Sequence, residues 1–301
     1  MKKLILIAAA AFFLPDAGQG QEVFSIKIDP SGMTVGSGTP GSVVKETPIG
    51  TAEQEFFYDF RCLKDTTDKT GEAKASEDIM VLQVGRGISK FYSYRKLQTD
   101  SLLHATPPEQ ILADPGKFVA RGAQSYILFK NYPSGKFSLT DKIGRDNLRY
   151  QEDIPEMEWE LMDETKEVQD YTCYRAECGF RGRRYIAWYT LEIPVSEGPW
   201  KFGGLPGMIL EVADSEGHYS FTLNGIRTDL SREITLPDLQ YHGTTREKYL
   251  KTLRLFETDP IGYMSANAGV NVTVRRMDGS SDSEAMGPRE MKYDYMETDY
   301  Q

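Results

Sequence analysis

Short stretches of alternating apolar and polar residues are the feature that most limits how this chain can fold. The clearest stretch is His218–Asn224, in which Tyr219, Phe221 and Leu223 fall on one side and polar residues fall on the other. A period of two places all apolar side chains on one face of a strand, whereas a helix needs a period near 3.6. The pattern therefore predicts antiparallel β-structure with one face in solvent.

Other stretches rich in aromatic and β-branched residues also have the length of strands. With the stretch above, they are Glu55–Leu63, Asp78–Val84, Ser89–Tyr94, Ser125–Tyr132, Lys136–Thr140, Tyr171–Cys178, Tyr185–Ile193, Met208–Val212 and Tyr219–Ile226. Turn sequences suited to hairpins lie between some of them, at Gly85–Gly87, Pro133–Gly135 and Ser215–Gly217. The Tyr185–Ile193 stretch is apolar on both faces, which predicts a central, covered strand.

One segment has the period of a helix instead. In Glu247–Glu257 four apolar residues recur on one stripe, and Pro260 ends the pattern. A shorter helical turn is expected from Pro107. Together, the patterns predict a mainly β protein: a single large antiparallel sheet, curled into an open barrel or bowl, with one α-helix in the C-terminal half.

The first twenty residues have the properties of a secretory signal peptide. Lys2 and Lys3 form a basic start, and Leu4–Leu14 is apolar. Residues 18–20 offer a small-residue cleavage site, with no cysteine nearby for a lipid anchor. We therefore expect an exported protein, periplasmic or secreted, that is not a lipoprotein. No membrane span is expected, because the longest apolar run has 11 residues and a span needs roughly 18.

Composition divides the rest of the chain into three parts. Over residues 31–50, 13 of 20 positions are Gly, Pro, Ser or Thr, which predicts a flexible lead-in over residues 21–50. The strand patterns predict a β domain over residues 51–265. Residues 266–301 are polar and acidic, and we expect an exposed tail there, with room for one edge strand.

The balance of charge excludes one class of partner. The chain has 35 Lys and Arg against 45 Asp and Glu, a net charge of −10. Nucleic-acid binding needs a basic surface that displaces counterions from phosphate, so no nucleic-acid partner is expected.

The three cysteines are an odd number for an exported chain. Cys173 and Cys178 lie on one expected strand, roughly 16 Å apart at ~3.3 Å per residue, whereas a disulfide needs Cα atoms within about 7 Å. A bridge from Cys62 to either of them stays open. We interpret all three as small buried hydrophobic residues.

A segment dense in glycine and proline follows the expected central strand. Residues 198–207 read Gly-Pro-Trp-Lys-Phe-Gly-Gly-Leu-Pro-Gly. Proline fixes φ and glycine permits φ > 0, so the path of the backbone is tightly restricted. The segment lacks the Lys-Ser/Thr pair of a phosphate-binding loop and precedes a strand rather than a helix. It predicts a rigid corner, anchored on the sheet by Trp200, Phe202 and Leu205.

This region resembles the signature of the GLPGLI family of exported Bacteroidota proteins. The signature residues are Gly198, Pro199, Gly203, Gly204, Leu205, Pro206 and Gly207. Met208 stands where the family usually has Leu. Similarity in order and spacing extends over roughly residues 50–265, for example at Tyr171–Ala176 and Ala187–Thr190. The resemblance implies a β-rich fold and an exported location, but no activity and no catalytic residue.

No pattern indicates a catalytic site, a metal site or a cofactor. His104, His218 and His242 lie in different expected elements without a metal-binding spacing. A Gly-x-Ser-x-Gly nucleophile turn is missing from the sequence. The acidic run from Glu152 to Glu164 has the groups for paired-carboxylate catalysis or for binding Ca²⁺, but a solvated surface is the simpler interpretation.

An open curled sheet has a concave face, which is a physical reason to expect binding. The candidate binding residues are Tyr185, Trp188, Tyr189, Trp200, Phe202, Arg181 and Arg183. The aromatic side chains either line a hollow for an apolar or peptide ligand or fill the core. The arginines either bind an anion or neutralise nearby acidic residues.

Three functional hypotheses follow. The first is an exported non-enzymatic module that binds a peptide, a lipid or an envelope protein on this concave aromatic face. The alternative is a structural or assembly component of the cell envelope that pairs through its sheet edges. The second alternative is a secreted hydrolase, so whether the protein is an enzyme stays undecided.

Overall fold

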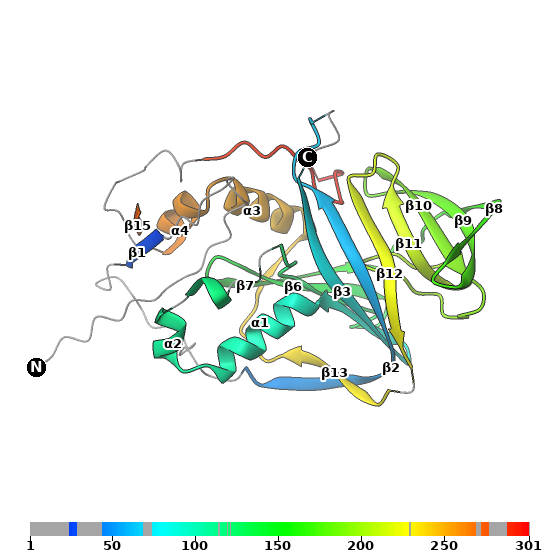
Figure 1. Ribbon diagram of the computed structural model, residues 1–301, viewed down its shortest axis with the longest axis horizontal. Coiled ribbons are helices and arrows are strands. Elements are labelled where there is room, and N and C mark those ends of the chain that lie inside the picture. Colours follow the sequence, from blue (N-terminus) through cyan, green and yellow to red (C-terminus); the bar gives the residue numbers. More distant parts are fainter. Residues whose placement is uncertain are drawn as a thin grey trace, which may run out of the picture.

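The computed structural model describes residues 44–68, 74–113, 115–118, 120, 122–228, 230–268 and 288–300, and the backbone of residues 24–28 and 272–276 (Figure 1). The expected signal peptide lies outside these residues. One sheet of 13 strands dominates the fold. Its strands are β2 (Glu46–Leu63), β3 (Ala75–Gly85), β4 (Ile88–Ser93), β5 (Ile127–Lys130), β6 (Lys136–Ile143), β7 (Asp146–Asp153), β8 (Glu160–Val168), β9 (Tyr171–Phe180), β10 (Arg183–Thr190), β11 (Met208–Asp214), β12 (Tyr219–Arg227), β13 (Arg232–Pro237) and β14 (His242–Thr244).

The sheet is open, and its two ends approach each other. Its strand order is β14-β7-β6-β5-β4-β3-β2-β12-β11-β10-β9-β8, with β13 paired to β2. Neighbours are antiparallel except for β14 and β7, which are parallel. No strand pairing among the described residues closes the order into a barrel, yet Glu152 of β7 forms an ion pair of 2.5 Å with Arg181, just beyond β9. This confirms the expected mainly β fold with one large, unclosed sheet.

Strand β2 organises this sheet because it pairs with three others. Along one edge it pairs with β3 from Ala52 to Leu63. Along the other, residues 55–62 pair with β12 and residues 46–52 pair with β13. The expected flexible lead-in is therefore wrong over residues 46–50. Their Pro and Gly content is typical of a loop, and the pairing partner β13 lies far away in the sequence.

The expected helix is confirmed as α3 (Arg246–Thr258), whose Tyr249 and Leu250 are buried. The short turn expected from Pro107 corresponds to α2 (Pro108–Ala113), which is followed by a 3-10 helix at Pro115–Phe118. Two further helices, α1 (Tyr94–Ala105) and α4 (Pro260–Ala268), were not expected. No residue of α1 is buried, so the sequence has no apolar stripe to reveal it. Figure 1 shows the helices together on one side of the molecule, away from β8–β11.

The core is aromatic and centred on β2. Phe56 and Tyr58 are fully buried, and the Tyr58 hydroxyl donates to the Ile209 carbonyl oxygen at 2.7 Å, which ties β2 to β11. The Phe221 ring lies 4.8 Å from that of Phe60. Burial of each such side chain stabilises the fold by about 1.5–3 kcal/mol relative to its exposure.

All three cysteines are free and buried, as interpreted from the sequence. Burial raises the pKa of Cys173 to about 11 and the pKa of Cys178 to about 12. These thiols are therefore protonated and unreactive at neutral pH.

Most of the acidic run is exposed, as the interpretation as a solvated surface expects, but its two ends lie in strands that were not predicted. Glu152 lies at the end of β7 and Glu160 begins β8. Charged residues on both faces hide the period of two in these strands, so neither strand was predicted.

No helix among the described residues is both long and apolar enough to cross a membrane. A separate pair, β1 (Phe24–Ile28) and β15 (Val272–Arg276), is antiparallel.

Candidate functional site

The corner at residues 198–207 is held from beneath by one buried lysine. Lys130 of β5 donates to the carbonyl oxygens of Gly198 (2.6 Å) and Phe202 (2.7 Å). It also forms an ion pair with Glu197 at 2.9 Å. Burial lowers the pKa of Lys130, and Glu197 opposes that shift only in part. The lysine thus fixes two points of the corner at once.

Close packing also requires glycine at particular positions of the corner. A Cβ on Gly207 would lie 1.9 Å from the carbonyl oxygen of Thr190, so the close approach requires glycine. Gly204 adopts a φ of +86°, which also favours glycine. The Trp159 indole donates to the Gly203 carbonyl oxygen at 2.9 Å. The corner is accordingly a packed bend of the sheet, as the sequence predicted.

The aromatic residues expected to line a binding hollow form core instead. Four of them are at most 6 % exposed: Tyr185, Tyr189, Trp200 and Phe202. Phe202 packs edge-on against Tyr185 with ring centroids 4.7 Å apart. Trp188 is half-buried, and the Lys166 ammonium lies 4.5 Å above its ring. The prediction that these four residues line a concave binding face is therefore wrong. The corner packs over their side chains and fills the space that a ligand would need.

The expected arginines do come together, at the turn between β9 and β10. Arg181 and Gly182 form this two-residue turn with φ of +51° and +83°, the geometry that tight hairpins favour. Phe180 and Arg183 pair across its base. The turn has two different surroundings: it contacts residues 288–300, and it also lines a cleft.

On one side the turn contacts residues 288–300, which we call the strap. The strap backbone is held by groups of the sheet. Tyr185 donates its hydroxyl to the Met296 carbonyl oxygen (2.6 Å), and the Arg183 Nε donates to that of Tyr295 (2.9 Å). The Thr298 amide donates to the carbonyl oxygen of Arg181 (2.8 Å). Three of the predicted binding residues thus bind a peptide segment, and that segment belongs to the same chain.

The strap differs from the exposed tail expected for the end of the sequence. Tyr300 is 5 % exposed and Glu297 is 3 % exposed. Tyr293 and Tyr295 donate their hydroxyls to the carboxylate of Glu257, on α3. The sequence of the strap is polar, but its tyrosines and acids have buried partners. The expected exposure is therefore wrong for Glu297 and Tyr300, whereas other strap residues, such as Glu290 and Asp294, are exposed.

A cluster of six charged residues, which we call the ion cluster, lies between the strap and the sheet. Its members are Glu152, Arg181, Lys201, Arg246, Glu297 and Asp299. Lys201 is completely buried and bonds to Glu152 (2.5 Å) and Glu297. Arg246, at the start of α3, bonds to Glu297 (2.7 Å) and Asp299 (2.6 Å). Three cations thus face three anions.

Mutual attraction keeps this cluster ionised despite its burial. Burial alone would lower the pKa of Lys201, but Tyr150, Glu297 and Glu152 raise it above its usual value. Burial would likewise raise the pKa of Asp299, yet the hydrogen bond and charge of Arg246 hold it below its usual value. The cluster is closed and balanced, so its chemistry is structural.

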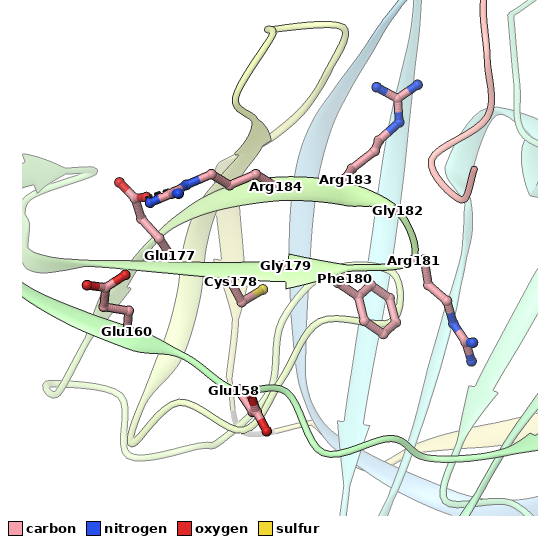
Figure 2. Close-up of a pocket in the computed structure, with 10 residues that line it drawn as sticks. All are labelled: Glu158, Glu160, Glu177, Cys178, Gly179, Phe180, Arg181, Gly182, Arg183 and Arg184. Atoms are coloured by element: carbon pink, nitrogen blue, oxygen red, sulfur yellow. Dashed lines mark hydrogen bonds and ion pairs between the residues drawn. The ribbon is translucent and has the colours of Figure 1, made fainter. Parts of the chain in front are cut away.

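On its other side the turn lines an open cleft of about 510 Å³ (Figure 2). The pairing of β8 with β9 ends at Glu160 and Glu177, whereas β9 continues to Phe180. The chain before β8 turns away, because Trp159 is anchored on the corner. The last three residues of β9 therefore lack a neighbour strand on this side.

Gly179 presents its backbone to this cleft. In a two-residue hairpin the closing pair exchanges both hydrogen bonds, and the direction of N–H and C=O alternates along a strand. Since Phe180 and Arg183 are the closing pair, the amide and carbonyl of Gly179 point away from β10. Gly179 is exposed, and an added Cβ there would meet nothing within 4 Å. The edge is therefore accessible to another backbone.

Some charged side chains around the cleft have ion-pair partners and others do not. Glu177 accepts hydrogen bonds from Arg175 and from Arg184 (2.7 Å), and Arg184 holds its pKa below the usual value. Glu158 and Glu160 are exposed, and neither has an ion pair among the described residues. Figure 2 shows Glu160 on β8 and Glu158 on the chain where it diverges from β9. The cleft thus has two uncompensated carboxylates.

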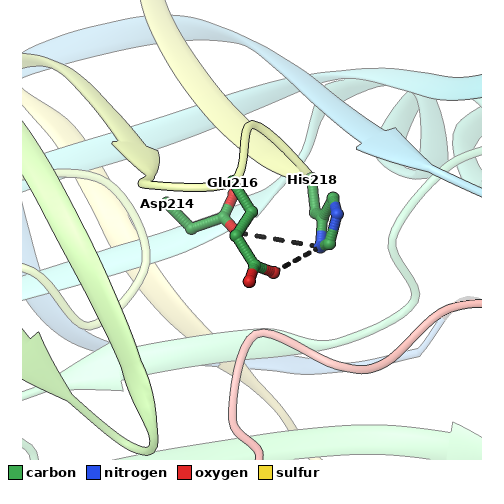
Figure 3. A group of neighbouring side chains, drawn as sticks. All are labelled: Asp214, Glu216 and His218. Atoms are coloured by element: carbon green, nitrogen blue, oxygen red, sulfur yellow. Dashed lines mark ion pairs between the residues drawn. The ribbon is translucent and has the colours of Figure 1, made fainter. Parts of the chain in front are cut away.

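A second group of polar residues lies in the β11–β12 turn, where Asp214, Glu216 and His218 have ligand atoms within 4.8 Å of one another (Figure 3). Sequence reasoning missed this group, although its alternate spacing across a hairpin turn could have revealed it. Arg183 lies 3.2 Å from Asp214 and 3.8 Å from Glu216. The guanidinium takes the place where a cation would bind, so we assign no metal to this group.

A smaller cleft of about 340 Å³ is lined by residues of β2, β3, β12 and the start of α1. Its aromatic floor is Phe57, which the Arg227 guanidinium covers at 4.7 Å from the ring centroid. The ring face is therefore not free to stack on a ligand.

Comparison with known families matches part of this site. A profile described as "Protein of unknown function (Porph_ging)" matches residues 181–211. This is a Bacteroidota-associated family of unknown function. The matched segment runs from the β9–β10 turn through β10 and the corner into β11. It contains all seven predicted binding residues, including Arg181, Arg183 and Tyr185, which contact the strap.

Two solved structures are similar to the chain, both titled as structures of PNGF-II. The first, in space group P21, is 13 % identical with a TM-score of 0.43, and the match covers 68 % of this chain and 33 % of that one. The second, in space group C2, is 12 % identical with a TM-score of 0.43, and it covers 66 % and 32 %. The chain spans about a third of the length of these structures. No curated protein matches the sequence.

Proposed function

We propose that this protein is an exported, non-enzymatic binding module that captures an extended segment of a partner protein at the cleft beside Gly179. One observation carries the proposal: β9 continues three residues beyond its pairing with β8, and the freed edge borders a cleft of about 510 Å³. An extended peptide that adds to such an edge forms backbone hydrogen bonds whatever its own amino-acid sequence is. Envelope proteins are the proposed partners.

The character of the cleft favours a peptide over a lipid. The groups exposed there are the Gly179 backbone and charged side chains, and Cys178 and Phe180 are buried beneath it. Acyl chains need an apolar cavity to leave water, whereas main-chain amides need the hydrogen-bonding edge that β9 offers. This replaces the concave aromatic face as the binding surface.

Export and family membership are part of the same proposal. The basic and apolar pattern of residues 2–14 supports a signal peptide. The residues from Gly204 to Ile209 support membership of the GLPGLI family and lie within the segment that the Porph_ging profile matches.

The test is selection of peptides from a random displayed library on the purified protein, with affinity measured by fluorescence anisotropy. We expect the selected peptides to lose at least tenfold in affinity for Gly179→Trp, because the indole fills the cleft. Gly243→Trp is the matched control, since Gly243 is an exposed glycine with open space at β14, the opposite edge of the sheet. Equal binding by both variants, or failure to select any peptide, would refute the proposal.

A further inference from the structure

We infer that the segment captured at the cleft is basic, with a lysine or arginine opposite Gly179 that binds the carboxylates of Glu158 and Glu160. This inference rests on the proposed function and specifies the partner's chemistry. It follows from three features of the cleft: which charges are already paired, what the edge strand repels, and where space for a long side chain exists.

The arginines around the cleft are already engaged. Arg181 bonds to Glu152, and Arg183 bonds to Asp214 and to the strap. Arg184 bonds to Glu177. An acidic ligand would therefore have to break an existing ion pair to find a cation. A basic ligand meets two exposed carboxylates that have no ion pair within the described residues.

The edge strand β8, next to the cleft, also favours a basic partner. β8 carries four acidic residues, Glu160, Asp163, Glu164 and Glu167. Its one lysine, Lys166, bonds to Glu211 at 2.7 Å. Edges with repeated like charge resist pairing with a copy of themselves, and like charges opposite each other destabilise a strand pair. A second copy of this chain and an acidic peptide are both disfavoured, whereas a basic strand is attracted.

The backbone geometry provides the space. Glu160 lies directly opposite Glu177 in the β8–β9 register. A residue opposite Gly179 lies two positions further along, so its side chain has the same face as these two glutamates. Gly179 has no Cβ, which leaves room for an aliphatic stem to cross it. A lysine or arginine can place its stem there and its charged end beside the carboxylates.

The experiment uses three peptides that differ at one position. Each has the sequence Gly-Thr-Val-Thr-Xaa-Thr-Val-Thr-Gly, with Lys, Gln or Glu at the centre. Because ion pairs between exposed groups are weak, we expect the Lys peptide to bind the full-length protein about threefold more tightly than the Gln peptide. The Glu peptide should bind most weakly. Added salt should narrow these differences.

Two protein variants identify the groups responsible. The double variant Glu158→Gln, Glu160→Gln should bind the Lys and Gln peptides equally. Glu156→Gln is the matched control, since Glu156 is an exposed acid of the same run that does not line the cleft, and it should keep the full difference.

The outcomes separate this inference from the proposed function. If the Gln peptide binds as tightly as the Lys peptide and both are lost in Gly179→Trp, the strand-addition site stands and the basic partner is wrong. If no peptide binds, both are wrong. If sedimentation shows a dimer that Gly179→Trp abolishes, the partner is a second copy, and the inference is again overturned.

Discussion

The two sides of the β9–β10 turn contrast sharply, although the same few residues form both. On the strap side, Arg181 and Arg183 hold a peptide segment, and Lys201 is sealed among carboxylates. On the cleft side, Gly179 and two glutamates face solvent without such partners. Charged residues therefore act structurally where every charge is matched and most are buried. In the proposed function, charged residues take part in recognition only where β8 stops pairing with β9.

The strap also explains why we propose the cleft, and not the strap side, as the binding site. A tethered segment has an effective concentration in the millimolar range, so an external peptide competes poorly for the strap side. The cleft has no such competitor among the described residues. The predictions below test whether the two sides differ as this comparison requires.

The largest expected effect is on the closed side. Lys201→Met removes the fully buried cation between Glu152 and Glu297 and leaves the ion cluster with one more anion than cation, although Arg181 and Arg246 still contact these carboxylates; removal of one member of a buried ion pair costs up to about 3–5 kcal/mol. We expect urea unfolding to show a loss of that size. Lys136→Met is the control, because its ion pair with Asp153 is exposed and should contribute less than about 1 kcal/mol. Equal losses for both variants would contradict the structural role of the ion cluster.

A pair of glycine variants compares the two sides directly. In Gly182→Ala the new Cβ would lie 2.3 Å from the Thr298 Oγ on the strap, at a φ of +83°. We expect a loss of about 1–2 kcal/mol in the free energy of unfolding, because φ > 0 is unfavourable for alanine. Gly179→Ala meets open space and should change stability by less than about 0.5 kcal/mol. Thermal unfolding measures both, and a reversed order would refute the contrast.

A smaller effect concerns pH. Arg246 holds the pKa of Asp299 below its ordinary value of 3.8, so the folded state binds this proton less readily than the unfolded state. The stabilisation is therefore complete above about pH 4 and is lost as the pH falls through the lower folded value. Hydrogen exchange of the Thr298 amide should report the loss as weaker protection of the strap in acid. In Asp299→Asn this component of the pH dependence should disappear; its persistence would assign the transition to another group.

The smallest effect is expected for Arg184→Gln. The Arg184 side chain is 60 % exposed, and Glu177 keeps its bond to Arg175 when Arg184 is lost. Exposed ion pairs contribute roughly 0–1 kcal/mol, so the midpoint of urea unfolding should hardly move. A loss comparable to that of Lys201→Met would mean that the cleft side is as tightly coupled as the strap side.

Sequence patterns predicted those parts of the fold in which the burial of each residue follows a regular period along the chain. The alternation around Phe221 identified β12, and the stripe containing Leu250 identified α3, because local period reports burial directly. Prolines and glycines likewise identified the corner. Where charge is buried, the pattern fails. Glu152 and Glu297 look like surface residues until Lys201 and Arg246, far away in the sequence, supply their partners.

The candidate site could be predicted only in part for the same reason. Arg181 and Arg183 were selected as binding residues, and the structure places both in contact with the strap, whose polar sequence indicated an exposed tail. Tyr185 was selected for its ring, yet its hydroxyl makes the contact. The free edge at Gly179 depends on where β8 stops pairing, and no local pattern encodes the end of a partner strand.

The pairing of β2 has a consequence for the order in which the molecule assembles. Its partner β12 begins at Tyr219, opposite Cys62, so more than half of the chain must be synthesised between the two strands. Contacts between residues so distant in sequence slow folding. The conformational entropy of the long intervening loop is lost before the contacts form and stabilise the sheet. A nascent chain would thus hold an incomplete sheet with an unfilled central edge until late in translation, and that is the stage at which a holding chaperone would be most useful to it.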